Sequence, residues 1–142
     1  MTARLKGRRR QAEAIISAVN RWAAEQNDVS ALALVGSYAH GQPGMASDVD
    51  LVLVTDDPDR HARGLDWIVF YDPRAQLIRD QWWGPLRERR VRLHSGLQVE
   101  LGIVWPTWAS LPLDPGTQRV LRDGCRILHD PQSRLKEARA TL

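Results

Sequence analysis

Two short apolar runs, residues 29–35 and 49–54, constrain the fold of this chain more than any other feature. Each is too short for an ordinary helix and is bounded by turn-forming residues, so both predict β-strands, the first buried on both faces. The first run stops at Gly36-Ser37, and residues 37–41 predict a single helical turn beginning beside Gly36. The chain therefore requires a sheet with a tight turn at the end of one strand.

The second run opens with two carboxylates, Asp48 and Asp50. Side chains two positions apart on a strand share a face, so these carboxylates are expected side by side. They repel each other, and stability alone gives little reason to place them at the start of an apolar strand. A divalent cation would neutralise them, and backbone N–H groups of the Gly36-Ser37 turn would complete a site for a metal-bound phosphate.

Glu100 is the best candidate for a third carboxylate, because it stands alone in a largely apolar segment, residues 99–104. A buried carboxylate is costly unless it is paired or bound to a metal. The alternative is an ion pair with Arg89 or Arg92 across the predicted hairpin turn at 95–96. Two metal ions about 3.5–4 Å apart would lower the pKa of an attacking hydroxyl and steady a departing pyrophosphate. Mg²⁺ takes oxygen ligands, which carboxylates supply.

The composition is that of one ordinary globular domain. The chain has 142 residues, of which 43% are hydrophobic and 26% charged, enough for one core but not for two. A formal net charge of +3 and a pI near 9.6 suit a phosphate-bearing ligand and are weak support for nucleic acid. The basic run Arg4, Lys6 and 8–10 is interpreted as a solvated terminus, with nucleic-acid contact as the less favoured alternative.

Cysteine usage and hydropathy narrow the class of protein further. A single cysteine, Cys125, excludes an internal disulfide and a cysteine-based metal site. No apolar stretch approaches the ~18 residues of a membrane span, and the N-terminus has no signal-peptide core. We therefore expect a soluble, cytoplasmic protein without a membrane partner.

Periodicity and turn signals predict the remaining elements. Residues 64–75 stay undecided between a strand and a buried helical turn. The predicted helices cover residues 11–27 (starting near residue 8), 58–63 after the cap Asp57, 114–123 with Asp114 as the cap, and a last helix capped by Ser133. The predicted strands cover residues 29–35, 47–55, 75–83, 86–94, 97–105 and 125–129.

This order of elements predicts an α/β or α+β fold, a mixed β-sheet flanked by helices in a single domain over residues 1–142. An N-terminal helix, about 8–27, precedes a catalytic core, about 29–104. A helix, a strand and a helix follow, at about 114–142.

The sequence resembles the DNA polymerase beta-like nucleotidyltransferase superfamily. The shared pattern is a glycine-serine turn, here Gly36-Ser37, then Asp-x-Asp at residues 48–50 and a later strand carboxylate, Glu100. With Gly41 and Ser47, the pattern is similar to the minimal nucleotidyltransferases of bacteria and archaea, and it extends over residues 29–104. The resemblance implies the superfamily's nucleotidyltransferase fold.

The resemblance also implies roles for these residues. Gly36, Ser37 and Ser47 would bind the nucleotide, an NTP such as ATP. Asp48 and Asp50 would hold two Mg²⁺ ions, for which Mn²⁺ can substitute, and Glu100 would be the third carboxylate, giving Asp48, Asp50 and Glu100 as metal ligands and catalytic residues.

His40 departs from the family pattern, because many relatives carry arginine at this position of the loop. A histidine titrates near neutrality, whereas an arginine keeps its charge, so His40 is expected either to bind phosphate weakly or to face solvent. The other histidines, His61, His94 and His129, show no metal-ligand spacing and are interpreted as surface or turn residues.

The implied activity is transfer of a nucleoside monophosphate from an NTP to a hydroxyl on a protein, an RNA or a small molecule, with release of pyrophosphate. Residues after 104 are too few for the helical acceptor domain of antibiotic-modifying relatives, so the acceptor surface would come from a second subunit, as in a homodimer, from a partner protein or from the acceptor itself. Minimal relatives are often antitoxins of two-gene toxin–antitoxin modules with a helical partner protein. The alternative is a catalytically weak NTP-binding or partner-neutralising module.

Three other segments have alternative interpretations. Trp82-Trp83 predicts a packing pair at a strand end rather than a base-stacking platform. The basic segment 87–92 is either a solvated face or a surface from which Arg89 or Arg92 steers a triphosphate or an acceptor. The apolar segment 105–112 is expected to cover the sheet rather than to face a partner protein.

Overall fold

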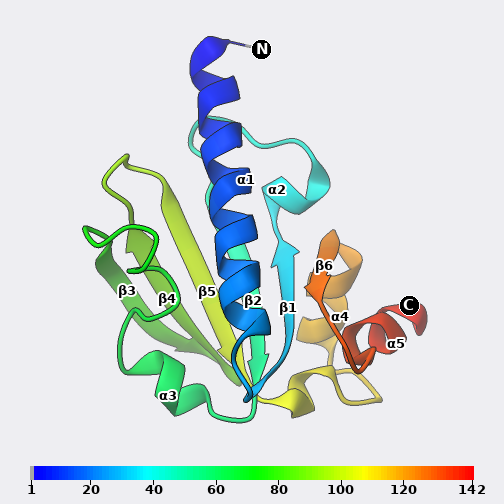
Figure 1. Cartoon of the computed structure of the whole chain (residues 1–142). Coiled ribbons are helices and arrows are strands. Elements are labelled where there is room, and N and C mark those ends of the chain that lie inside the picture. The colour runs from blue at the N-terminus through cyan, green and yellow to red at the C-terminus, as the bar shows by residue number, and fades with distance from the viewer. Residues whose placement is uncertain (1) are drawn as a thin grey trace.

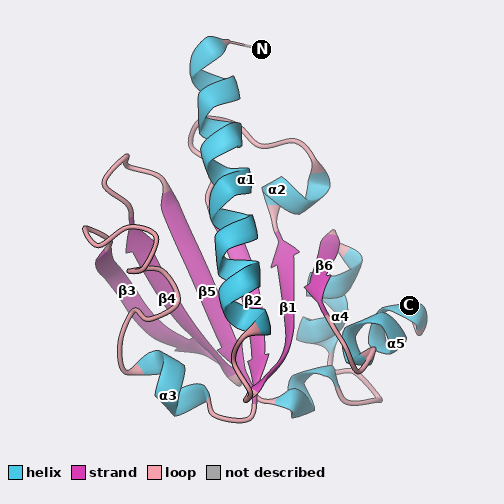
Figure 2. Ribbon diagram, in the orientation of Figure 1, coloured by secondary structure: helices cyan, strands magenta, loops and turns pink. Residues whose placement is uncertain are grey.

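The computed structural model describes residues 2–142, in which five α-helices and a short 3₁₀ helix surround one six-stranded mixed sheet (Figures 1 and 2). The order of the strands in the sheet is β3-β4-β5-β2-β1-β6, and only the β2–β5 pair is parallel. The strands are β1 (Val29–Val35), β2 (Val49–Thr55), β3 (Gln76–Trp83), β4 (Leu86–Arg92), β5 (Gln98–Val104) and β6 (Cys125–His129). The helices are α1 (Ala3–Ala24), α2 (Ser37–His40), α3 (Pro58–Ala62), η1 (Pro106–Ala109), α4 (Pro115–Arg122) and α5 (Arg134–Ala140).

The predicted strands are all present, within two residues at their ends, and the mixed sheet flanked by helices confirms the expected fold class. The undecided segment 64–75 forms turns rather than a strand. Its side chains Trp67 and Ile68 are fully buried in the core between α1 and the sheet. Burial of these two side chains explains why the segment reads as apolar although it has no regular structure.

The two faces of the sheet have separate cores, because side chains alternate along each strand. Leu51 and Leu53 of β2 pack in the core that contains the buried stripe of α1, and Val52 and Val54 pack in the core that contains η1, α4 and α5. Asp114 caps α4 as predicted, its Oδ1 accepting a hydrogen bond from the Thr117 N–H at 3.0 Å.

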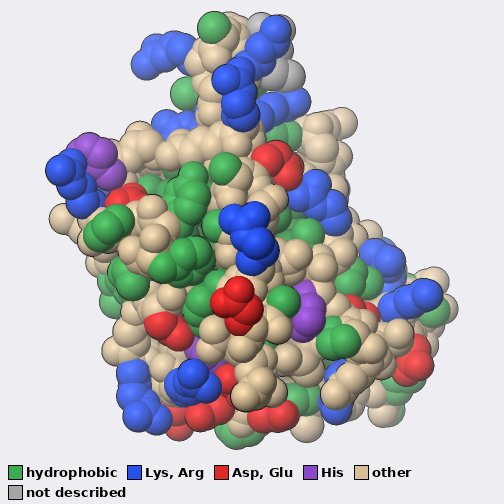
Figure 3. All heavy atoms as spheres, in the orientation of Figure 1, with side chains coloured by type: hydrophobic (Ala, Val, Ile, Leu, Met, Phe, Trp, Pro, Cys, Tyr) green, Lys and Arg blue, Asp and Glu red, His purple; other side chains and the backbone are tan. Residues whose placement is uncertain are grey.

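Helix α1 begins earlier than predicted, at Ala3, where the Thr2 hydroxyl accepts a hydrogen bond from the Leu5 N–H at 3.1 Å. The buried stripe starts only at Ala12, so apolar periodicity carries no signal for the first turns. Those turns project beyond the sheet (Figure 1), and Lys and Arg side chains gather around them (Figure 3). Arg4 and Lys6 are exposed there, as expected of a solvated terminus.

Two local predictions are wrong. Ser133 precedes α5 but makes no side-chain cap, and the carboxylate of Asp130 accepts from the Leu135 and Lys136 N–H groups instead, at 3.3 and 2.9 Å. His61 is not a surface residue, because its side chain is fully buried. Its Nε2 lies 2.5 Å from Asp28 Oδ2 and its Nδ1 lies 3.3 Å from Asp66 Oδ2.

The apolar segments near the sheet edge divide between core and solvent. Trp108 of η1 is buried against the sheet as predicted, whereas Trp105 is 53% exposed. Trp82 and Trp83 are 59% and 58% exposed, so they are not a buried packing pair. They lie on β3, an edge strand whose side chains are mostly exposed. None of the helices found between residues 2 and 142 has the length and hydropathy of a membrane span.

Candidate active site

The candidate active site is a row of charged side chains across three neighbouring strands. Asp50 of β2 is paired in register with Glu100 of β5, and Glu100 is paired with Arg90 of β4. Paired residues present their side chains on the same face of the sheet. The register therefore brings the two carboxylates, predicted from segments fifty residues apart, next to each other, with a guanidinium beside them.

Arg90 connects the acidic residues. Its guanidinium forms an ion pair with Asp48, lies 3.3 Å from Glu100 Oε1 and donates to Gln98 Oε1 at 3.1 Å. The sequence-based alternative that Arg89 or Arg92 pairs with Glu100 is wrong. Arg89 is buried on the opposite face, where it donates to Asp80 at 2.8 Å and to the Gly64 carbonyl at 3.1 Å.

Glu88 is a fourth carboxylate in this cluster, and sequence reasoning missed it. It is 2% exposed and accepts hydrogen bonds from Arg79 Nε at 2.6 Å and from Trp83 Nε1. Arg90 Nε lies 3.5 Å from it. The interpretation of residues 87–92 as a solvated or steering surface is therefore wrong for Glu88. The available signal was the alternation along β4, which places Glu88 and Arg90 on the face opposite buried Val91.

Burial and the neighbouring carboxyl groups shift the pKa values of the acidic row. Burial, a hydrogen bond with Glu88 and the charge of Asp50 raise the pKa of Glu100 to about 8. Burial raises the pKa of Asp50 to about 6, with Asp48 adding repulsion, although a hydrogen bond with Glu100 opposes the shift. Burial alone would raise the pKa of Glu88, but hydrogen bonds with Glu100, Trp83 and Arg79 lower it overall. At neutral pH and without a metal, Glu100 is therefore the protonated member.

Gly36 lies directly against the acidic row. Its φ is +74°, a conformation that favours glycine. A Cβ at this position would lie closer than 3.0 Å to Asp50 Oδ2 and 3.3 Å from its Cγ. Gly36 also precedes α2, so the first N–H groups of that short helix begin beside the Asp50 carboxylate.

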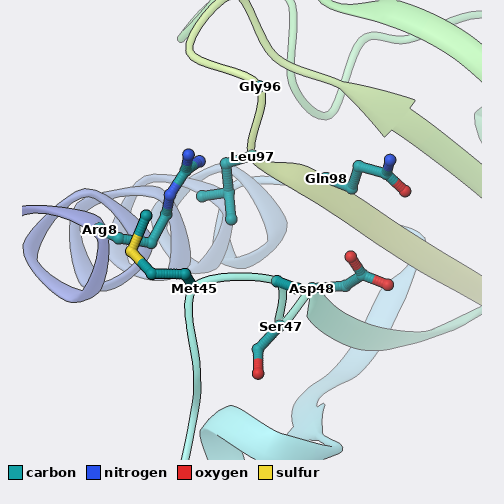
Figure 4. Close-up of a pocket in the computed structure, with 8 residues that line it drawn as sticks. Arg8, Met45, Ser47, Asp48, Gly96, Leu97 and Gln98 are labelled. Atoms are coloured by element: carbon teal, nitrogen blue, oxygen red, sulfur yellow. The ribbon is translucent and has the colours of Figure 1, made fainter. Parts of the chain in front are cut away.

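The other predicted nucleotide-binding residues lie around this turn. Ser37 opens α2 and is half-buried. His40 is exposed and lines a cavity of about 280 Å³ with Gly36, at the side of Gly124. Ser47 lines a different cavity, of about 200 Å³, together with Asp48 and Arg8 (Figure 4). Its hydroxyl accepts from the Gly44 N–H at 2.8 Å and so stabilises the loop before Asp48.

A divalent cation fits the chemistry of these residues but not their present positions. Asp48, Asp50 and Glu100 offer the oxygen ligands that Mg²⁺ requires, and two of them, Asp50 and Glu100, are half-buried carboxyls with raised pKa values. Throughout residues 2–142, however, no three His, Cys, Asp or Glu side chains are placed so that they could hold a metal ion as they stand. Arg90 would have to leave Asp48, and Glu100 would have to lose its proton.

Comparison with known proteins assigns the chain to a family. Residues 16–107 match the family model of the nucleotidyltransferase domain, so the chain belongs to this family. A search of curated proteins finds no significant match.

Solved structures with a related fold include the Cid1 poly(U) polymerase, at 13% identity and a TM-score of 0.44 over 69% of this chain and 30% of that one. They also include Cid1 with the UTP analogue UMPNPP, at 14% identity and a TM-score of 0.45 over 72% and 31% of the chains. A third is Cid1 with its short product ApU, at 14% identity and a TM-score of 0.46 over 72% of this chain and 31% of that one. The chain thus spans about a third of the length of these proteins.

Proposed function

We propose that this domain transfers a nucleoside monophosphate from an NTP to a hydroxyl acceptor and releases pyrophosphate. The observation that carries the proposal is the in-register pair Asp50–Glu100 beside Gly36, with Asp48 on the same face. Membership of the nucleotidyltransferase family supports it. We further propose that residues 1–142 act as one catalytic domain.

In the proposed reaction, the acceptor oxygen forms a bond to the α-phosphorus of the NTP. The bond from that phosphorus to the oxygen bridging toward the β-phosphate breaks, and pyrophosphate leaves with the electron pair. The acceptor proton passes to a carboxylate of the site, Glu100 or Asp50, or to solvent. Most of the catalysis comes from positioning and from charge neutralisation.

Each residue of the site has a proposed role. Asp48, Asp50 and Glu100 would hold two Mg²⁺ ions, which when bound lower the pKa of the hydroxyl and neutralise the leaving pyrophosphate. The Gly36-Ser37 turn would receive the triphosphate. Its N–H groups approach the ligand closely because Gly36 has no side chain. His40 lines the cavity beside Gly36 and would contact the outer phosphates.

The acceptor is proposed to be a hydroxyl on a partner protein, with RNA or a small molecule as other outcomes of the test below. This follows the resemblance to the minimal nucleotidyltransferases, which are often antitoxins of a helical toxin, and this protein would then be a cytoplasmic antitoxin. Exposed Trp105 and Leu111, 53% and 56% exposed, supply an apolar surface beside η1 that such a partner could cover.

Incubation with each α-³²P-labelled NTP, Mg²⁺ and a cell lysate tests the proposal and finds the acceptor. Wild type should label one class of macromolecule, whereas Asp48→Asn and Asp50→Asn should not. Asp59→Asn, which removes an exposed carboxylate of α3, is the matched control and should label like wild type. Equal labelling by the Asp50→Asn variant would exclude the proposed mechanism.

The second candidate is an NTP-binding module with weak turnover. The ion pairs of Arg90 with Asp48 and Glu100 favour it, since they compete with a metal for the same oxygens. A rise in the melting temperature with ATP–Mg²⁺, without transfer to any acceptor in the lysate, would select this candidate.

A further inference from the structure

A small apolar slot lies at the far end of the strands that carry the acidic row. It is lined by Trp83, Pro85 and Leu86 of the β3–β4 hairpin, Trp108 of η1, the helix cap Asp114, and Gly116, Thr117 and Val120 of α4. Its volume is about 210 Å³.

The slot opens on the same face of the sheet as the carboxylates. Leu86, Glu88 and Arg90 alternate along β4, so all three point to that face, and Trp83 is paired in register with Leu86. Arg90 links Glu88 to Glu100, because its Nε lies 3.5 Å from Glu88 Oε1 and its Nη2 lies 3.3 Å from Glu100 Oε1. The slot is thus connected to the acidic row through neighbouring side chains of one face.

Trp83 joins the two regions. Its indole lines the slot, and its Nε1 donates a hydrogen bond to the Glu88 carboxylate. More than half of the side chain, 58%, is nevertheless exposed to solvent. A large indole that is held by a hydrogen bond yet uncovered offers an aromatic surface at low entropic cost to a ligand.

The dimensions and the lining select one class of ligand. The slot is smaller than the ~300–1,000 Å³ of pockets that enclose a drug-sized molecule, so it takes one ring system rather than a whole nucleotide. The apolar side chains of Trp83, Leu86, Trp108 and Val120 disfavour a phosphate, which would lose its hydration there. A flat aromatic heterocycle can instead stack on the indole, as bases do on aromatic side chains.

We propose that this slot binds a nucleobase and that Trp83 is its stacking platform. The inference rests on the proposed nucleotidyl transfer, because a nucleobase reaches this face of the sheet on the donor NTP or on a nucleic-acid acceptor. It replaces the sequence-based preference for Trp82-Trp83 as a packing pair.

Trp82 provides a matched control for Trp83. The two residues are adjacent on β3 and equally exposed, but they point to opposite faces of the sheet. The guanidinium of Arg87 lies 5.5 Å from the centre of the Trp82 ring, away from the slot. Trp83→Phe is a second control, because it keeps an aromatic ring and removes only the N–H that bonds to Glu88.

The experiment measures equilibrium binding of three probes in the presence of Mg²⁺: ATP, inorganic tripolyphosphate and a short oligoadenylate. Trp83→Ala should weaken binding of a base-containing probe by about 5- to 150-fold, the range expected for loss of one base–aromatic stack. Trp82→Ala and Trp83→Phe should change it by less than about threefold, and tripolyphosphate should bind every variant alike. Circular dichroism checks that the variants are folded.

The two sources of the base are separated by the probes. Weakened ATP binding assigns the slot to the donor base, and weakened oligoadenylate binding with unchanged ATP binding assigns it to an acceptor base. Unchanged binding of both probes by Trp83→Ala would overturn the inference while leaving the proposed transfer intact. Failure of wild type to bind any probe would contradict both.

Discussion

A Cβ atom on Gly36 would overlap the Oδ2 atom of Asp50. The glycine-serine turn and the Asp-x-Asp strand therefore meet in van der Waals contact, and no side chain can stand between them. Gly36 combines this close approach with a φ of +74°. Both features place backbone N–H groups beside a carboxylate that is proposed to hold a metal, which is the arrangement that a metal-bound triphosphate requires.

Gly36→Ala should abolish nucleotidyl transfer and lower the free energy of unfolding, because the added Cβ displaces Asp50 and strains the backbone. Gly41→Ala is the matched control, since Gly41 has nearly the same φ, +75°, but open space around an added Cβ. Backbone strain alone costs about 1–3 kcal/mol. The loss in Gly36→Ala should exceed that in Gly41→Ala in chemical denaturation, and equal losses with retained activity would contradict the contact.

Glu100→Gln should stabilise the metal-free protein at pH 8 while abolishing transfer. The folded state raises the pKa of Glu100 from its ordinary 4.5 to about 8, so it favours the protonated form. The protonated Glu100 side chain therefore makes its full contribution to the free energy of unfolding below pH 4.5, and this contribution is lost as the pH rises to about 8. We expect Glu100→Gln to gain on the order of 1–2 kcal/mol at pH 8. Melting temperatures of wild type and Glu100→Gln, measured from pH 5 to 9, check this. A difference between the two proteins that does not change with pH would refute it.

Arg90→Gln should lower stability without metal and enlarge the stabilisation by Mg²⁺. Arg90 forms an ion pair with Asp48 and lies 3.3 Å from Glu100 Oε1, so removing it leaves Asp48 without its cation. The loss should be about 1–3 kcal/mol, and Mg²⁺ should restore more of it than in wild type. Arg92→Gln, an exposed arginine of the same strand, is the control for charge. A smaller Mg²⁺ effect in Arg90→Gln would show that Arg90 assists metal binding instead of opposing it.

His61→Gln should destabilise the protein most at pH 6 and less at higher pH. Burial alone would lower the pKa of His61, but its hydrogen bonds to Asp66 and Asp28 raise it overall. Its charged pairs therefore stabilise the fold fully below its ordinary pKa of 6.5 and lose this effect as the pH rises through the raised value. A difference of about 1–3 kcal/mol at pH 6 is expected. His94→Gln, at an exposed position, is the control for loss of a histidine side chain.

Local sequence patterns predicted the strands well and singled out the carboxylates that the structure brings together, because both follow from alternation within one segment. The apolar runs defined β1 and β2, and a lone acidic residue in an apolar strand marked Glu100. The placement of Asp50 beside Glu100 needed one further fact, the parallel pairing of β2 with β5. The family resemblance supplied the expectation that a later strand contributes a third carboxylate, but it did not supply this pairing.

Features that depend on strand register or on contacts outside one segment could not be predicted. Arg90 faces Glu100 because the β4–β5 hairpin pairs these two positions, and a shift of one residue would have placed Arg89 there instead. Burial of His61 depends on Asp28, which is distant in sequence. The capping of α5 by Asp130 depends on a turn in which Ser133 takes a φ of +58°, which sequence alone does not reveal.

The most direct test of the account compares α-³²P-ATP with γ-³²P-ATP in parallel reactions containing Mg²⁺ and the acceptor found in the lysate, for wild type, Asp50→Asn and Asp59→Asn. Nucleotidyl transfer predicts that wild type and Asp59→Asn place label on the acceptor from α-³²P-ATP only, that the γ-label leaves as pyrophosphate, and that Asp50→Asn transfers neither. Label from γ-³²P-ATP on the acceptor, or undiminished α-label transfer by Asp50→Asn, would contradict the assignment of these carboxylates to nucleotidyl transfer.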